Sequence, residues 1–187
     1  MAGEITSTMD QILSAREERS RIQDRLLVQY KKPLISFTMN IPGPVKNADW
    51  ISQSFEYGKE DLLAYFSSTG IRLVDEEETP AGPEAFFIIE NTTDNNMSDA
   101  FAIKKMAVLF EQQHAAGRWY DVDVRSSDGR FISREQIGAA ERKCFICGRS
   151  AKLCGRSRQH TAEELFQFTR TNLQHYLLQK DHDPSDC

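Results

Sequence analysis

The sequence predicts an α+β fold, and three observations support this prediction. Four segments place apolar residues at the spacing of one helix face. Four shorter apolar segments, bounded by turn residues, are typical of β-strands. Between the first helix and a cysteine-rich segment, the predicted order is strand, helix, strand, strand, helix, strand. This is the split β-α-β order of ferredoxin-like folds, in which helices cover one face of an antiparallel sheet and the first and last strands are neighbours.

The first quarter of the chain is expected to hold a helix and a strand. Residues 7–30 begin with Ser, Thr and Asp capping candidates, and their apolar residues recur at helical spacing. Residues 33–40 are predicted to form a strand. Two prolines and a glycine in 41–47 argue against regular structure there. A second helix is expected over 48–68.

The middle of the chain is expected to hold two strands and a third helix. Residues 71–77 and 84–91 are predicted to be strands on either side of a turn that contains proline and glycine. A polar loop follows, in which Ser98 or Asp99 is expected to cap a helix over 100–117.

The last third is expected to begin with the fourth strand, residues 118–124. The turn 126–130 and a short returning arm at 130–133 follow. A final helix is expected over 161–179, and 181–187 is a polar tail that we expect to be disordered. The whole chain, 1–187, is interpreted as a single domain with a Cys/His-rich subsite at 142–160.

Composition limits the class of protein. The 187 residues are 40% hydrophobic and 27% charged, as in ordinary globular proteins. The sequence has neither an apolar run long enough to cross a bilayer nor the layout of a secretory signal, so we expect a cytoplasmic protein without a membrane partner. A net charge of −5 argues against a nucleic-acid partner. Residues 130–158 nevertheless contain eight basic residues against two acidic ones, which suits a discrete anionic ligand.

The fourth strand contains two aspartates, Asp121 and Asp123, that are expected to share one face. Tyr120, Val122 and Val124 would then occupy the buried face. Paired carboxylates repel each other, and Mg²⁺, which binds one or two carboxylates together with phosphate oxygens and water, would relieve that repulsion. A catalytic Mg²⁺ site is therefore one interpretation, and a solvent-facing structural pair is the other.

The stretch "NIPGPVKN", residues 40–47, lies between a strand and a helix. Asn40, Gly43 and Lys46 are candidates for binding substrate, because this backbone can approach a ligand closely and the next helix N-terminus offers free N–H groups to phosphate. The alternative is a rigid connector.

The cysteine-rich segment has the spacing Cys-x2-Cys-x6-Cys-x5-His. Three thiolates and an imidazole can complete a tetrahedral structural zinc site, here Cys144, Cys147, Cys154 and His160. The alternative is a reduced cysteine cluster that packs without metal.

Several of these segments together resemble one family. They are "REER" from Arg16, "PLISFTMNIPGPVKN" from Pro33, "GPEA" from Gly82, "AIKKMAVLFEQQHAAGRWYDVDV" from Ala102 and "RKCFICGRSAKLCGRSRQH" from Arg142. In this order they are similar to the apo-citrate lyase phosphoribosyl-dephospho-CoA transferases, also called citrate lyase holo-acyl-carrier-protein synthases (CitX). The resemblance spans nearly the whole chain.

The resemblance implies a nucleotidyltransferase. It would move 5-phosphoribosyl-dephospho-CoA from 2′-(5″-triphosphoribosyl)-3′-dephospho-CoA to a serine of the citrate lyase acyl carrier (gamma) subunit, forming a phosphodiester and releasing pyrophosphate. Asp121 and Asp123 match the family's motif and would bind Mg²⁺. Our own candidates for phosphate contacts are basic: Lys46, Arg118, Arg156 and Arg158.

The sequence leaves three other functions to consider. The first is the same transfer to the malonate decarboxylase carrier protein. The second is a zinc-stabilised protein-binding module without catalysis. The third, an RNA-binding ferredoxin-like domain, is disfavoured because Phe86 and Phe87 lie between glutamates instead of within a basic surface.

Overall fold

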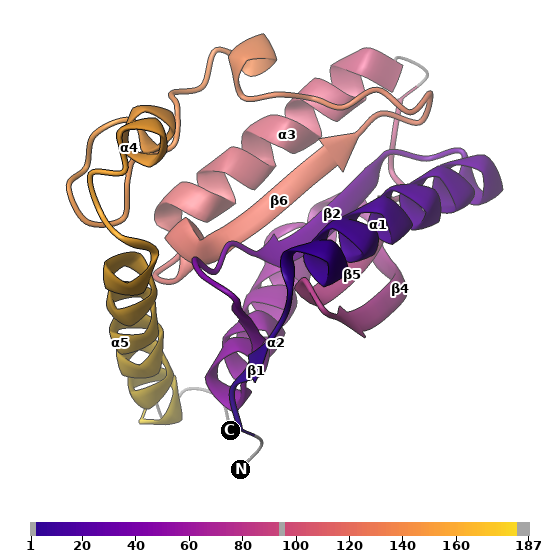
Figure 1. The fold of residues 1–187 in the computed structure, drawn as a ribbon. Coiled ribbons are helices and arrows are strands. Elements are labelled where there is room, and N and C mark those ends of the chain that lie inside the picture. The colour runs from indigo at the N-terminus through magenta and orange to yellow at the C-terminus, as the bar shows by residue number, and fades with distance from the viewer. Residues whose placement is uncertain (1–2, 94–95, 183–187) are drawn as a thin grey trace.

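The computed structural model describes residues 3–93 and 96–182, which form five α-helices and two antiparallel sheets (Figure 1). The strands of the larger sheet are β2 (Leu34–Met39), β4 (Ile71–Thr79), β5 (Gly82–Ile89) and β6 (Tyr120–Arg125). The helices are α1 (Met9–Tyr30), α2 (Asp49–Tyr65), α3 (Asn96–Gln113), α4 (Ala151–Ser157) and α5 (Ala162–Asp181). Short 3-10 turns lie at Ser67–Thr69, Gly117–Trp119 and Glu135–Ile137. Among the described residues, no helix has an apolar stretch long enough to cross a bilayer.

The strand order of the larger sheet is β4-β5-β2-β6, and every neighbouring pair is antiparallel. The first and last predicted core strands, β2 and β6, are therefore neighbours, as expected. Helix α2 follows β2 and its adjoining loop, and α3 lies between β5 and β6. The predicted α+β class with a ferredoxin-like order is confirmed.

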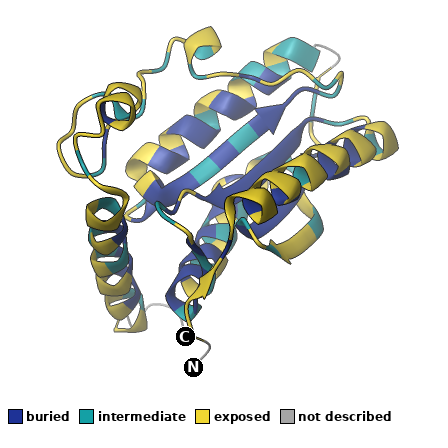
Figure 2. Ribbon diagram, viewed as in Figure 1, coloured by how far each residue is buried: buried dark blue, intermediate teal, exposed yellow. Residues whose placement is uncertain are grey.

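The two faces of this sheet carry different helices (Figures 1 and 2). On one face, side chains of β2 such as Phe37 join the main core with α2, α3 and α5. Helix α2 approaches this face so closely that a Cβ on Gly58 would lie 2.4 Å from Cζ of Tyr120. On the other face, α1 packs through Ile22 and Leu26 onto Leu34 and its neighbours. Figure 1 shows α1 in front of β2 and β5, beside β6, so the face of β6 on this side is not covered by a helix.

On the outer edge of β6, side chains of α3 form hydrogen bonds with backbone groups of the strand. Lys104 donates to the carbonyl oxygen of Val122 at 2.8 Å, and the backbone N–H of Val122 donates to Glu111 at 2.8 Å. Both side chains are buried, and their spacing of seven residues places them on one face of the helix. Two charged side chains thereby pair the backbone groups of Val122 at this edge, and the Val124 carbonyl accepts from the N–H of Ile132 at 3.0 Å, so the edge strand does not expose unpaired groups there.

Residues 41–47 differ from the prediction. Val45–Asn47 form β3, which pairs with β1 (Ile5–Thr6) in a two-stranded antiparallel sheet, so the expectation of no regular structure is wrong for this half of the loop. The prolines do not prevent this pairing, because a proline lacks only the backbone N–H. The Pro44 carbonyl still accepts a hydrogen bond from the N–H of Ser7 at 2.9 Å.

Three other boundaries also shift. Helix α3 already includes Ser98 and Asp99, so neither is its cap, and the residue before Asn96 lies outside the described residues. The fourth strand begins at Tyr120, after a 3-10 turn, and the predicted arm after it returns as a single bridge between Arg125 and Phe131.

The C-terminal part adds an element that the prediction lacked. Helix α4 lies within the cysteine-rich segment, and α5 extends to Asp181. The remainder of the predicted tail, 183–187, lies outside the described residues.

Candidate functional site

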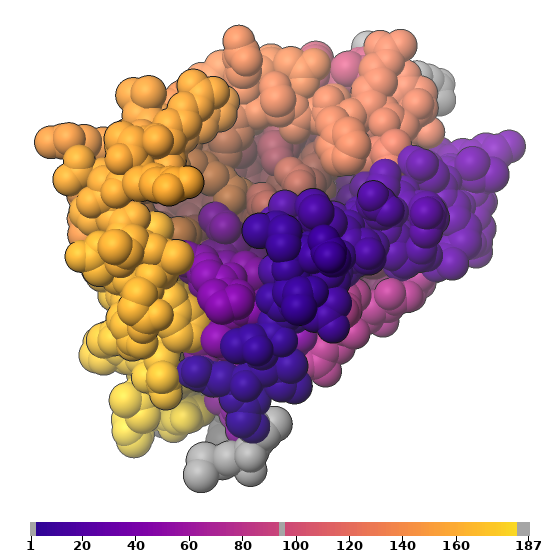
Figure 3. Space-filling view, in the orientation of Figure 1, coloured from indigo at the N-terminus to yellow at the C-terminus, as the bar shows by residue number. Residues whose placement is uncertain are grey.

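The two aspartates of β6 lie on the face of the sheet that carries α1. Asp121 is opposite Thr38 of β2, and Asp123 is opposite Ser36. Their side chains are 37% and 50% exposed, whereas Tyr120 and its alternating partners on β6 are buried. The shared face predicted from the sequence is therefore observed. Figure 3 shows this side of the molecule hollowed between α1, the purple 40–47 segment and the orange cysteine-rich segment.

Each carboxylate has a cation from another element beside it. Arg142 Nη2 lies 2.8 Å from Asp121 Oδ1, and Lys104 Nζ lies 3.6 Å from Asp123 Oδ1. Burial, followed by the charge of Asp121, raises the pKa of Asp123, while Lys104 opposes this shift. Among the described residues, the second oxygen of each carboxylate has no hydrogen-bond partner. Each aspartate therefore offers a hard oxygen donor without a hydrogen bond, and this donor set fits Mg²⁺.

Arg142 connects the aspartates to a buried glutamate. Its Nη2 also lies 2.9 Å from Glu111 Oε1, and Arg134 contacts the other oxygen of Glu111. Burial raises the pKa of Glu111, and the nearby charge of Arg142 counteracts the shift. A buried carboxylate is tolerated here because two guanidinium groups and the Val122 N–H share its charge.

A cavity of about 600 Å³ adjoins this cluster. Its lining combines four basic side chains with polar and aromatic groups, including Arg118, Arg134, Arg142, Lys143, Asn40 and Phe145. Glu111 also lines it, and through Arg142 the cavity wall reaches Asp121. Asp121 and Asp123 do not line the cavity themselves, so a ligand with several negative charges would meet the basic groups of the wall, and Arg142 connects that wall to Asp121.

The predicted substrate-binding residues occupy different places. Asn40 and Arg118 line the cavity. Gly43 has φ +79°, and a Cβ there would lie 3.8 Å from Phe166, so this glycine packs towards α5. Lys46 donates to the carbonyl of Ile41 in its own loop, and burial, followed by the charge of Arg16, lowers its pKa.

The other two candidates, Arg156 and Arg158, are exposed on and after α4 and are not part of the cavity wall. Arg158 ends this helix in a left-handed conformation, φ +48°. Among the described residues, the ion pairs of Asp121 and Asp123 are with Arg142 and Lys104, and neither Arg156 nor Arg158 contributes one.

Four residues of the cluster were not singled out from the sequence: Lys104, Glu111, Arg134 and Arg142. Lys104 and Glu111 have the spacing of one helix face, and this was the only signal that could have identified them as a buried pair. No pattern in the sequence distinguishes Arg134 or Arg142 from the other basic residues of their segment.

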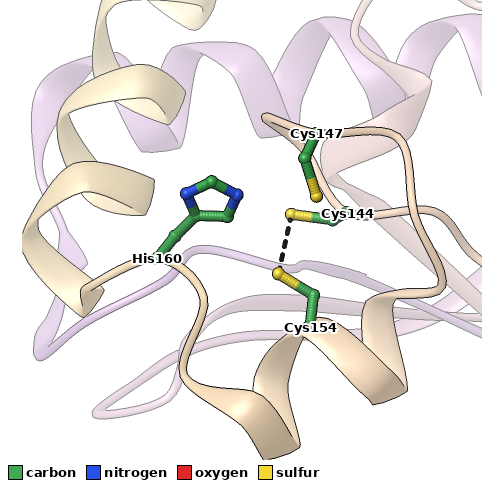
Figure 4. Close-up of side chains that lie close together, drawn as sticks. All are labelled: Cys144, Cys147, Cys154 and His160. Carbon is green, nitrogen blue, oxygen red and sulfur yellow. Dashed lines mark hydrogen bonds between the residues drawn. The ribbon is translucent and has the colours of Figure 1, made fainter.

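The cysteine-rich segment brings all four predicted ligands together (Figure 4). The ligand atoms of Cys144, Cys147, Cys154 and His160 lie within 4.8 Å of one another, and the sulfur atoms of Cys144 and Cys154 are 3.4 Å apart. His160 Nε2 is buried and has no hydrogen-bond partner among the described residues. Three sulfurs and one nitrogen at this spacing can hold a metal ion with tetrahedral coordination.

The thiols of this cluster differ in acidity. Burial acts to raise the pKa of Cys144, but the backbone N–H groups of Cys147 and Ile146 outweigh it, and the pKa falls. The hydrogen bond with Cys144, followed by burial, raises the pKa of Cys154 to about 11. Adjacent thiolates need a cation to stay ionised together, so a metal ion would replace the proton of Cys154.

The comparisons with known proteins all point to one family. The model of the apo-citrate lyase phosphoribosyl-dephospho-CoA transferase (CitX) family matches residues 7–176. A probable apo-citrate lyase phosphoribosyl-dephospho-CoA transferase of Vibrio cholerae serotype O1 is 35% identical over 166 residues, which cover 87% of this chain and 89% of the relative. Transferases of the same name from Citrobacter koseri and Escherichia coli O157:H7 are 31% and 28% identical, each over 84% of both chains. The chain therefore belongs to the apo-citrate lyase phosphoribosyl-dephospho-CoA transferase family.

Proposed function

We propose that the protein transfers 5-phosphoribosyl-dephospho-CoA from 2′-(5″-triphosphoribosyl)-3′-dephospho-CoA to a serine of the citrate lyase acyl carrier (gamma) subunit. Family membership supports the transferred group and the acceptor complex. The observation that carries the proposal is the position of Asp121 and Asp123, half-exposed on β6 beside a cavity with a basic wall. A polyphosphate donor requires both features, a place for Mg²⁺ and cationic groups for its phosphates.

The cavity suits the phosphate-bearing part of the donor in chemistry. Its volume of about 600 Å³ is typical of sites for small molecules and cofactors. Arg118, Arg142 and Lys143 would bind phosphate oxygens, and Arg142 would place the reacting phosphate next to Asp121. Phe145, which stacks on Trp119 with 5.9 Å between ring centroids, would supply an apolar surface for the nucleotide or pantetheine part.

The aspartates of β6 and the cations beside them would neutralise the phosphate charge of the donor and fix its position. Asp121 and Asp123 would bind Mg²⁺, which supplies neutralisation of the triphosphate and stabilisation of the leaving oxygens. The buried side chain of Lys104 holds Asp123 in place through their ion pair. Arg142 would move its contact from the carboxylate to the donor, because a phosphate group competes well for a guanidinium group.

The proposed reaction is a nucleotidyl transfer in which one P–O bond forms and another breaks. The carrier serine Oγ forms a bond to the phosphorus atom attached to the ribose. The bond from that phosphorus to the bridging oxygen of the triphosphate breaks, pyrophosphate leaves and the hydroxyl proton is released.

We assign the metal of the Cys/His cluster as Zn²⁺ with a structural role, since three thiolates and an imidazole favour zinc over the hard cation expected at the aspartates. We also propose that residues 1–187 work as one nucleotidyltransferase domain. The cavity supports this proposal because its wall combines residues from Asn40 to Leu165.

The test combines the protein, donor, Mg²⁺ and apo-carrier, and measures the mass of the carrier. We expect the carrier to gain the mass of one phosphoribosyl-dephospho-CoA group and pyrophosphate to accumulate in equal amount. Omitting Mg²⁺, or replacing the acceptor serine of the carrier by alanine, should prevent both. A parallel reaction with the malonate decarboxylase carrier tests the rival acceptor. A folded protein that modifies neither carrier would contradict the proposal.

A further inference from the structure

The cysteine-rich segment has almost no hydrophobic core of its own. Between Ile132 and Phe166, the only buried residues are Cys144 and Cys154, two of the four clustered ligands. Of its larger apolar side chains, Ile137 and Phe145 are partly buried against the main core, whereas Leu153 is 63% exposed and Ile146 is 39% exposed. These two contacts bury little apolar surface for a segment of this length, so we expect a metal ion or a disulfide to be needed to offset its conformational entropy.

Backbone hydrogen bonds organise the segment only locally. The N–H of Cys144 donates to the Arg149 carbonyl at 2.7 Å, and the N–H of Ala151 donates to the Arg142 carbonyl at 2.9 Å. These bonds form a small hairpin around the Cys144–Cys147 turn, and α4, which carries Cys154, has only seven residues. Short helices and isolated hairpins are marginal in water, so this arrangement needs support from the cluster.

The same segment supplies the groups that complete the candidate site. Arg142 is two residues before Cys144 and contacts both Asp121 and Glu111. From the other side, Arg118 donates to the Cys144 carbonyl at 2.7 Å. Most of the cavity wall also comes from this segment, in the range 140–160.

We propose that Zn²⁺ bound by Cys144, Cys147, Cys154 and His160 folds residues 140–160 and thereby places Arg142 against Asp121 and Glu111. The zinc ion stabilises this segment in place of the hydrophobic core that it lacks. The cavity wall then exists only in the zinc-loaded protein, while the sheet and the aspartates on it do not depend on zinc. That the cavity binds the donor rests on the proposed function, but the folding of the segment does not.

The first test measures metal content and amide hydrogen exchange without any substrate. Protein purified in reducing buffer without chelator should contain one zinc per chain. After zinc is stripped, the amides of Cys144 and Ala151 should exchange about tenfold faster or more, and the β2 amides should keep their protection. Adding Zn²⁺ should restore the slow exchange. Absence of zinc, a disulfide between Cys144 and Cys154, or unchanged protection after stripping would overturn the proposal.

A pair of histidine variants provides the matched control. His160→Ala removes a proposed ligand, whereas His175→Ala changes an exposed histidine of α5 whose ring lies 3.0 Å from Gln179 Nε2. We expect His160→Ala to lose zinc affinity and protection at Cys144, and His175→Ala to retain both. Equal behaviour of the two variants would contradict the zinc site.

Donor binding is measured separately on the same samples. If the stripped protein loses protection and also loses donor binding, both proposals are supported. If protection depends on zinc but neither form binds the donor, the folding role of zinc stands and the proposed function fails.

Discussion

At the scale of single residues, Asp121 and Asp123 show how one pair can be tolerated in the fold and still be available for chemistry. A cation on each side, Arg142 and Lys104, reduces their repulsion, yet about half of the Asp123 side chain stays exposed. If the pair binds catalytic Mg²⁺, Asp121→Asn or Asp123→Asn should lower the transfer rate by about a hundredfold or more, since each tenfold loss needs only about 1.4 kcal/mol. Folding should survive, because neutralising one carboxylate relieves repulsion.

The measurement compares thermal melting and carrier modification for each variant. Asp75→Asn is the matched control, because Asp75 is also a strand aspartate with an arginine partner, Arg25, but lies on β4. Near wild-type transfer by folded Asp121→Asn and Asp123→Asn would end the metal-ligand interpretation.

His114 supports a second prediction, which concerns pH. The Ala116 N–H donates to His114 Nδ1 at 3.0 Å, so Nε2 carries the proton and donates to Asp61 at 2.8 Å. Burial lowers the pKa of His114, although Asp61 partly opposes this shift. The unfolded chain then binds a proton more readily than the folded one, so stability should fall as pH decreases through the ordinary histidine pKa of about 6.5.

Urea unfolding at about pH 7.5 and pH 5.5 measures this loss on the two sides of that pKa. His114→Gln should reduce the difference in unfolding free energy between the two pH values. His175→Gln, at an exposed position, should leave it unchanged. A wild-type protein that is more stable at the lower pH would contradict the assignment.

At the scale of elements, the closure of the β6 edge by α3 depends on a buried lysine. Lys104→Met keeps the length of the side chain but leaves the Val122 carbonyl without its donor and Asp123 without its cation. We expect it to destabilise the fold by about 1–3 kcal/mol, the usual cost of an unsatisfied buried polar group. Lys105→Met, at the exposed neighbouring position, should change the unfolding free energy by less than about 0.5 kcal/mol. Equal effects of the two substitutions in chemical unfolding would show that Lys104 does not stabilise this edge.

At the scale of the whole molecule, positive charge is concentrated in residues 130–158, although the chain as a whole has a net charge of −5. Arg156 and Arg158 lie outside the cavity wall, within the most basic stretch of the chain, and this position suits a surface for an acidic carrier protein better than a donor contact. Arg156→Glu or Arg158→Glu should slow association with the carrier at low salt, and the difference from wild type should shrink as salt rises. Arg21→Glu, on the exposed side of α1, is the control. Carrier association that is equal for all three variants at low salt would exclude this surface.

The sequence by itself determined most of the fold and part of the site. Strand and helix periodicity predicted the order of the core, because alternation and helical spacing are local properties. The same alternation placed Asp121 and Asp123 on one face, and the cysteine spacing predicted the four clustered ligands. Local rules failed where partners are distant, as in the pairing of β3 with β1.

The tertiary structure alone decided which charges meet the aspartates. Lys104 and Arg142 contact the aspartates, and Glu111 and Arg134 are connected to them through Arg142. Lys104 and Glu111 belong to α3 and the two arginines to a later loop, and only the packing of both segments around β6 brings them together. It also placed Arg118 on the cavity wall and kept Arg156 and Arg158 off it. The physical reason is that the sequence of a segment limits its own backbone and buried face, whereas an ion pair needs two segments to be fixed in space, and that position depends on the whole core.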